Sequence, residues 1–277
     1  MPDDNFEAYL EANGMGNGIP NDDYITTANI SGVTSLFVDG NNISDMTGIE
    51  GFISLTNLGC TSNSLINLDL SSNIGLTHLQ CQNNQLTSLD LSDNVNLEML
   101  LCFSNSLTSL DLSNNANLIE INCRDNQIAA LDLSNNTLLQ WLDCYSNQIA
   151  FLDLTANTEL INVQCNSNQL SCVNIKNGFN TNLLTFNTTL NPNLTCIEVD
   201  DVAWSTANWT NIDPQTLFST YCNNACSVGI SELNSNQPKE LIKIVNLLGQ
   251  EVEYTTNTIL IYQYADGTSE KVFTIED

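Results

Sequence analysis

Few side chains in this sequence are suited to catalysis. His78 is the only histidine, and the best pair of carboxylates, Glu120 and Asp143, could act as acid and base in a glycosidase. The sequence contains no phosphate-binding loop, nucleophile elbow or metal-binding motif. We therefore expect no catalytic residues, and we predict that the protein is not an enzyme.

Cysteines are more numerous and fall into two groups. Six of the ten recur every 21 residues: Cys60, Cys81, Cys102, Cys123, Cys144 and Cys165. Identical side chains on neighbouring repeats point the same way, so these six cysteines cannot form disulfides with one another. We expect them to pack in the core as small apolar residues. The other four are Cys172, Cys196, Cys222 and Cys226. Bridges from Cys172 to Cys196 and from Cys222 to Cys226 are two possible pairings, and connectivity stays open. A zinc site is a weaker alternative, because no histidine lies near.

Aspartates also recur at one place, in the phrase LDLS or LDLT: Asp69, Asp90, Asp111, Asp132 and Asp153. Stacked carboxylates would offer Ca²⁺ hard oxygen ligands, which would make a cation-binding ridge. Alternatively, each Asp caps a turn by accepting from groups about two residues further on. The Gly-rich nonapeptide of calcium β-rolls is absent. We therefore expect the capping role, no metal and no cofactor, with Ca²⁺ as the minor alternative.

These residues are positioned by a unit that returns every 21 residues from about Leu55 to Asn180. One unit shows its fixed places: Leu76 (place 1), Leu79 (4), Cys81 (6), Asn84 (9), Leu86 (11), Leu89 (14), Leu91 (16) and Asn94 (19). Such a unit is too short to bury a core alone, so successive units must stack and share one interior. Asn at place 9 predicts a ladder of amides that bind the backbone of adjoining coils. Its members are Asn41, Asn63, Asn84, Asn105, Asn126, Asn147 and Asn168.

The unit resembles the leucine-rich repeat family, whose signature LxxLxLxxNxL is met by residues 97–107 with Cys102 in place of the third Leu. The match covers roughly residues 33–200 and implies a β-rich repeat solenoid with about seven coils and a degenerate last coil. We expect an N-terminal cap at 1–32, with a short helix starting at Asp4 or Asn5. A C-terminal cap at 201–226, a linker at 227–238 and a small β segment at 239–277 complete the predicted organisation.

Places 3, 5 and 7 should point away from the core and line the concave sheet of the family, because strand side chains alternate. On three consecutive coils these places hold the predicted ligand-binding residues: Met99, Leu101, Phe103, Glu120, Asn122, Arg124, Trp141, Asp143 and Tyr145. Exposed aromatic residues around a central Arg are typical of binding hot spots. Alternatively, the apolar members fill a shallow groove, and Arg124 forms a surface ion-pair cluster with Glu120 and Asp143.

The charge balance limits the class of partner. Five Lys plus Arg stand against 32 Asp plus Glu, a formal net charge of −27, which disfavours nucleic acid and anionic membranes. The sequence has no run of 18 or more apolar residues, so it predicts no membrane-spanning segment. Residues 1–4 lack the basic and apolar regions of a signal peptide, which we expect to have been removed from this chain.

Residues 239–277 are similar to the C-terminal sorting segment of type IX secretion substrates of Bacteroidota. The similarity lies in residues 245–251 (VNLLGQE), 264–268 (YADGT) and 271–273 (KVF). It implies a small β-sandwich recognised by the outer-membrane translocon. The alternative is a β appendage without a sorting role. Residues 2–6 also resemble the start of secreted flavobacterial leucine-rich repeat proteins, so we expect a secreted or outer-membrane cell-surface protein.

Together these features predict a binding protein that recognises another protein, as in adhesion, through its concave face. The alternative is a carbohydrate-binding surface module that captures polysaccharide. A sugar stacked on Trp141 and Tyr145 should bind almost independently of salt. A basic protein attracted by the negative field should bind less tightly as salt rises.

Overall fold

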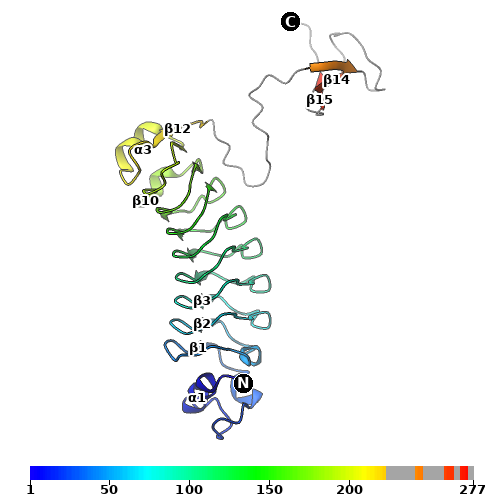
Figure 1. Cartoon of the computed structure of the whole chain (residues 1–277), viewed down its shortest axis with the longest axis vertical. Coiled ribbons are helices and arrows are strands. Elements are labelled where there is room, and N and C mark those ends of the chain that lie inside the picture. Colours follow the sequence, from blue (N-terminus) through cyan, green and yellow to red (C-terminus); the bar gives the residue numbers. More distant parts are fainter. Residues whose placement is uncertain (223–240, 246–258, 265–268, 274–277) are drawn as a thin grey trace. The chain divides into compact units, whose positions relative to one another are not determined.

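The structure is a computed structural model, and it describes residues 1–222, 241–245, 259–264 and 269–273. The chain divides into two compact units, Met1–Val228 and Gly229–Asp277. Figure 1 shows the larger unit as a stack of coils with helix α1 (Asp4–Ala12) at one end and α3 (Val202–Asn208) at the other. Within the described residues, no helix is long and apolar enough to span a membrane.

A parallel sheet takes one short strand from each coil of the larger unit. Within residues 1–222 its strands follow the order β1 (Ser35–Phe37), β2 (Asn57–Gly59), β3 (His78–Gln80), β4 (Met99–Leu101), β5 (Glu120–Asn122), β6 (Trp141–Asp143), β8 (Asn162–Gln164) and β10 (Thr185–Asn187). Leu79 pairs with Leu100, and Leu100 pairs with Ile121, so the predicted 21-residue period is confirmed. Identical places of successive coils therefore lie side by side.

The interior is a continuous column of Leu, Ile and Cys side chains. Leu97, Leu100 and Leu107 of one coil are fully buried, as are their counterparts in the next. The six repeat cysteines are buried free thiols, which confirms their prediction as core residues. Burial raises the pKa of these thiols, to about 12 for Cys81 and Cys123, so they remain protonated.

The predicted asparagine ladder at place 9 joins each coil to the one before it. The Asn105 amide donates to the carbonyls of Cys81 and Cys102, at 3.1 Å each, and its Oδ1 accepts from Leu86 N–H at 3.0 Å. Asn191 continues the ladder in the last coil. Asn41 differs, because no regular coil precedes it, and its Nδ2 donates to the Asp39 carbonyl.

A second asparagine ladder, which was not predicted, occupies place 19: Asn73, Asn94, Asn115, Asn136 and Asn157. The Asn115 Nδ2 donates to the carbonyls of Leu91 and Asn94 in the preceding coil, at 3.1 and 2.9 Å. These side chains are at most 1% exposed, and within the described chain their Oδ1 atoms have no hydrogen-bond partner. Their amide nitrogens satisfy carbonyls on the side of the coil away from the parallel sheet, where a β ladder cannot reach.

The N-terminal end of the stack is covered by α1 and the short helix α2 (Thr27–Ile30). Phe6 and Leu10 of α1 are fully buried against the first coil. Asp3 is the N-cap, one residue before the predicted start, because its Oδ1 accepts from the N–H groups of Asn5 and Phe6. Its Oδ2 accepts from the N–H and Oγ of Ser44 in the first coil, so one carboxylate joins the cap to the repeats.

The last coils carry a second parallel sheet with the order β12 (Leu217–Ser219), β11 (Cys196–Glu198), β9 (Cys172–Asn174) and β7 (Phe151–Asp153). Helix α3 and Trp209 lie in the chain between β11 and β12, and the centre of the Trp209 ring is 4.3 Å from that of Phe186. Trp204 and Phe218 pack on the same indole at 5.6 and 5.8 Å. These aromatic rings close the C-terminal end of the core.

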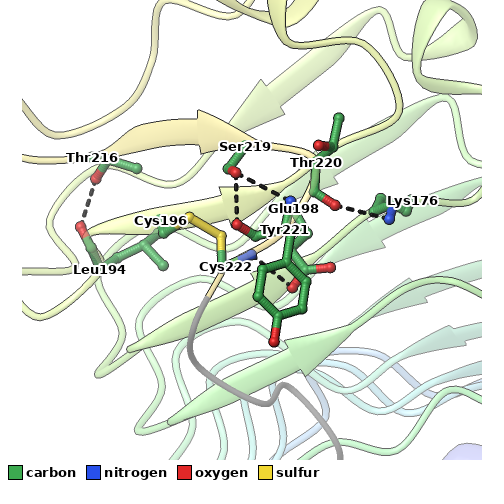
Figure 2. Close-up of a disulfide and its surroundings, with 9 residues drawn as sticks. All are labelled: Lys176, Leu194, Cys196, Glu198, Thr216, Ser219, Thr220, Tyr221 and Cys222. Carbon is green, nitrogen blue, oxygen red and sulfur yellow. Dashed lines mark hydrogen bonds between the residues drawn. A yellow bond between two sulfur atoms is a disulfide. The ribbon is translucent and has the colours of Figure 1, made fainter.

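A disulfide joins Cys196 of β11 to Cys222, with 5.9 Å between the Cα atoms (Figure 2). The two predicted pairings, Cys172 with Cys196 and Cys222 with Cys226, are therefore wrong. Cys172 lies beside Cys196 in the register of β9 and β11, but side chains on neighbouring parallel strands point the same way and do not face each other. Cys222 comes after β12, where the chain has left the repeat. Cys172 is disulfide-bonded as well, and Cys226 lies outside the described residues.

The described residues of the smaller unit form an antiparallel sheet of β13 (Leu241–Val245), β14 (Ile259–Tyr264) and β15 (Ser269–Phe273), with β14 in the middle. These strands lie within the β segment predicted at 239–277. The predicted linker at 227–238 lies outside the described residues.

Candidate functional site

The nine predicted ligand-binding residues share one face of the parallel sheet, which we call the patch. The register aligns Met99 with Glu120 and Trp141 across strands β4, β5 and β6. It also aligns Leu101 with Asn122 and Asp143 in the next row. The residues between these rows, Leu100, Ile121 and Leu142, are fully buried, so the rows themselves face away from the core. Phe103, Arg124 and Tyr145 form a third row, two residues further along each coil.

Arg124 lies between two aromatic rings. Its guanidinium carbon is 3.8 Å from the centre of the Phe103 ring and 5.5 Å from that of Tyr145. Both distances are within the range of cation–π attraction. The ring faces therefore stabilise the guanidinium and hold it over the middle of the third row.

The predicted ion-pair cluster of Arg124 with Glu120 and Asp143 is wrong. Within the described residues, the ion pair of Arg124 is with Asp125, at 3.4 Å between Nε and Oδ2. Glu120 lies four residues earlier on an extended chain, about 13 Å away along the strand. Asp125 follows Arg124 directly and shares its end of the coil.

The carboxylates of Glu120 and Asp143 lie in adjacent rows of neighbouring strands. Partial burial, and then the nearby Asp143 carboxylate, raise the pKa of Glu120 above its usual value, while His78 opposes the shift. Asp143 accepts from the amides of Asn162 at 2.8 Å and Asn122 at 3.4 Å. Within residues 1–222, no basic side chain forms an ion pair with either carboxylate.

Exposure across the patch is uneven. Trp141 is 40% exposed, whereas Asn122 at the centre is 8% exposed. The other seven members are half-buried. The patch therefore combines one exposed Trp ring with half-buried aromatic, aliphatic and charged side chains around the buried Asn122.

Two further residues of this face were not selected from the sequence. Phe37 of β1 is 49% exposed, and a Cβ added at Gly59 would come within 2.6 Å of its ring, so the ring lies over the glycine. Asn162 donates to Asp143 and fixes the carboxylate. Both residues occupy outward places of the repeat, and the register of β6 with β8 places Asn162 beside Trp141 and within reach of Asp143.

The geometry offers little for catalysis. The Nδ1 atom of His78 lies 2.9 Å from the Oγ1 of Thr77, and the ring is half-buried. Among the described residues, Glu120 and Asp143 lie half-buried on the outward face of a sheet, where water reaches both carboxylates. The arrangement favours binding over acid–base chemistry.

The aspartate column caps turns. In each coil the Asp accepts from the backbone N–H two residues on, at 3.0 Å, as Asp69 does from Ser71 and Asp153 from Thr155. These hydrogen bonds lower the pKa of Asp69, Asp90 and Asp111. Within the described part of the chain, no three His, Cys, Asp or Glu residues cluster closely enough to hold a metal ion.

Comparisons with known proteins agree with the coil geometry. No protein-family model matches the chain. The solved structure of internalin C2 from Listeria monocytogenes gives a TM-score of 0.60 at 21% identity, covering 79% of this chain and 93% of that one. A leucine-rich repeat protein of Leptospira interrogans gives 0.56 at 19% identity, covering 70% and 57%.

This chain has a leucine-rich repeat fold. A stretch of 73 residues is also 40% identical to internalin J of Listeria monocytogenes, which amounts to 26% of this chain and 8% of that protein. The leucine-rich repeat chain thus spans a small part of the curated relative that it matches. The functional domain of internalin J, whose solved structure includes a cysteine ladder, shares 25% identity over 78% of this chain and 68% of that one, with a TM-score of 0.33.

Proposed function

We propose that this protein is a non-enzymatic leucine-rich repeat binding protein that recognises another protein through the patch. One observation carries the proposal: three adjacent coils place Phe103, Trp141 and Tyr145 on one outward face, with Arg124 between the rings of Phe103 and Tyr145. Large aromatic side chains bury much area at little entropic cost, and they dominate many interfaces. The similarity to internalins supports a protein-binding scaffold.

The test compares the full chain with the variant F103A/W141A/Y145A against an array of envelope proteins and surface polysaccharides. The control variant Y24A/F179A/Y221A removes three exposed aromatic residues that lie outside the patch. We expect protein ligands whose affinity falls at least tenfold in the patch variant and little in the control. Equal binding by both variants would exclude the patch as the site.

Carbohydrate capture is the second candidate, and the accessible Trp141 ring beside Asp143 favours it. Sugar rings stack on Trp and accept hydrogen bonds from amides and donate them to carboxylates. Binding that appears on the polysaccharide half of the array and does not change with salt would select this function over protein recognition.

We also propose that the protein acts at the cell surface or outside the cell, and that residues 239–277 direct it through the type IX route of a Bacteroidota outer membrane. The sequence similarity of the tail and the antiparallel strands β13, β14 and β15 support this role. A reporter fused to residues 227–277 should reach the surface in a host with the translocon and stay in the periplasm without it. Retention in both hosts would favour a β appendage without a sorting role.

A further inference from the structure

The patch has two ends that differ in how their charges are satisfied. At one end Arg124 is held by the rings of Phe103 and Tyr145 and by the carboxylate of Asp125. At the other end, in the first row, Glu120 has no hydrogen-bond donor within residues 1–222, and among the same residues Asp143 in the middle row accepts only from the amides of Asn122 and Asn162. Folding thus neutralises the cation of the patch and leaves its two anions without a cation.

We propose that Glu120, Asp143 and Trp141 form the seat for a Lys or Arg side chain of the protein partner, an inference that rests on the function proposed above. Glu120 and Trp141 are direct register partners, so their side chains stand about 5 Å apart. A cation over the face of Trp is attracted by the ring, and the two carboxylates supply charge-assisted acceptors. The cation also relieves the repulsion between the carboxylates.

A second observation on the same face points to a partner rich in donors. Gln82 lies beside Phe103 in the third row, on the neighbouring coil. It is 9% exposed, and its Oε1 has no hydrogen-bond donor in the described chain. Lys and Arg carry donors and no acceptor atoms, so a basic segment of the partner can supply the donor that Gln82 Oε1 lacks.

The charge of the whole chain favours the same partner. The formal net charge is −27, and Arg124 is the only Lys or Arg from residue 1 to 175. Such a field attracts basic segments during approach and repels acidic ones. A bound metal ion explains the carboxylates less well, because the described residues provide no group of three metal-binding side chains.

The probe is a phage-displayed library of random linear peptides, selected on the full chain. We expect the enriched peptides to contain a Lys or Arg, and their neutral analogues, with norleucine for Lys or citrulline for Arg, to bind at least tenfold less tightly. On the variant E120Q/D143N the peptide and its neutral analogue should bind alike. The control variant D111N/D132N removes the same two charges away from the patch and should still discriminate them.

Two outcomes separate this inference from the proposed function. Peptides that need Phe103, Trp141 and Tyr145 but tolerate loss of their basic residue would overturn the seat and leave patch recognition standing. Peptides that bind F103A/W141A/Y145A as tightly as the native chain would overturn both. The comparison of each basic peptide with its neutral analogue is made on the native chain. It therefore remains valid even if a protein variant folds poorly.

Discussion

The guanidinium carbon of Arg124 lies 3.8 Å above the centre of the Phe103 ring, one coil away along the stack. The two residues occupy the same place of consecutive coils, so the 21-residue repeat itself sets their separation. Asp125 holds the Nε side of the same guanidinium. This contact positions the cation that stands at the centre of the third row of the patch.

Removing the Phe103 ring should weaken this contact measurably. In a double-mutant cycle of F103L and R124Q, we expect a coupling of about 0.5–1 kcal/mol in the free energy of unfolding, as for exposed cation–π pairs. Urea unfolding followed by circular dichroism measures it. The control pairs F37L with R124Q, because Phe37 lies on a distant strand of the same face. Equal couplings in the two cycles would contradict the contact.

The place-9 ladder should contribute more to stability than exposed asparagines. Asn105→Ala leaves the N–H of Leu86 and the carbonyls of Cys81 and Cys102 without their partner, so we expect a loss of about 2–4 kcal/mol in the free energy of unfolding. The control N117A removes one exposed hydrogen bond to Val95 and should cost less than about 0.5 kcal/mol. Similar losses in both variants would argue against the ladder.

The six repeat cysteines should resist alkylation while the chain is folded. Their pKa is raised by burial, to about 12 for Cys81 and Cys123, so the reactive thiolate is scarce at pH 8 and has no access to reagent. Iodoacetamide labelling read by mass spectrometry should mark Cys60 to Cys165 only after urea is added. Labelling at equal rates with and without urea would disprove their place in the core.

Stability of the N-terminal cap should depend on pH through Asp3. Burial alone would raise the pKa of Asp3, but hydrogen bonds from Ser44, Phe6 and Asp45 outweigh it and lower that pKa. The stabilisation is therefore complete above the ordinary Asp pKa of about 3.9 and is lost as pH falls through the lower folded value. We expect D3N to cost about 1 kcal/mol near neutral pH, because an Asn still caps α1 but lacks the second acceptor oxygen that binds Ser44. That difference, measured by urea unfolding at several pH values, should vanish in strong acid, while D4N should behave as the native chain throughout.

Periodic features of the molecule were accessible from the sequence alone. Stacked coils bring identical places together, so one unit predicted the buried Cys102, the amide ladder through Asn105 and the shared face of Phe103, Arg124 and Tyr145. The capping role of Asp69 followed from local turn chemistry. These relationships need only the period and the alternation of side chains along a strand.

Only the tertiary structure decided the relationships that break the period. Cys196 bridges to Cys222 and not to its register neighbour Cys172, because the chain leaves the repeat, forms α3 and returns along β12. Arg124 pairs with Asp125 because Glu120 lies at the far end of its strand. A repeating sequence determines which places become neighbours, whereas partners outside the repeat depend on the path of the chain in space.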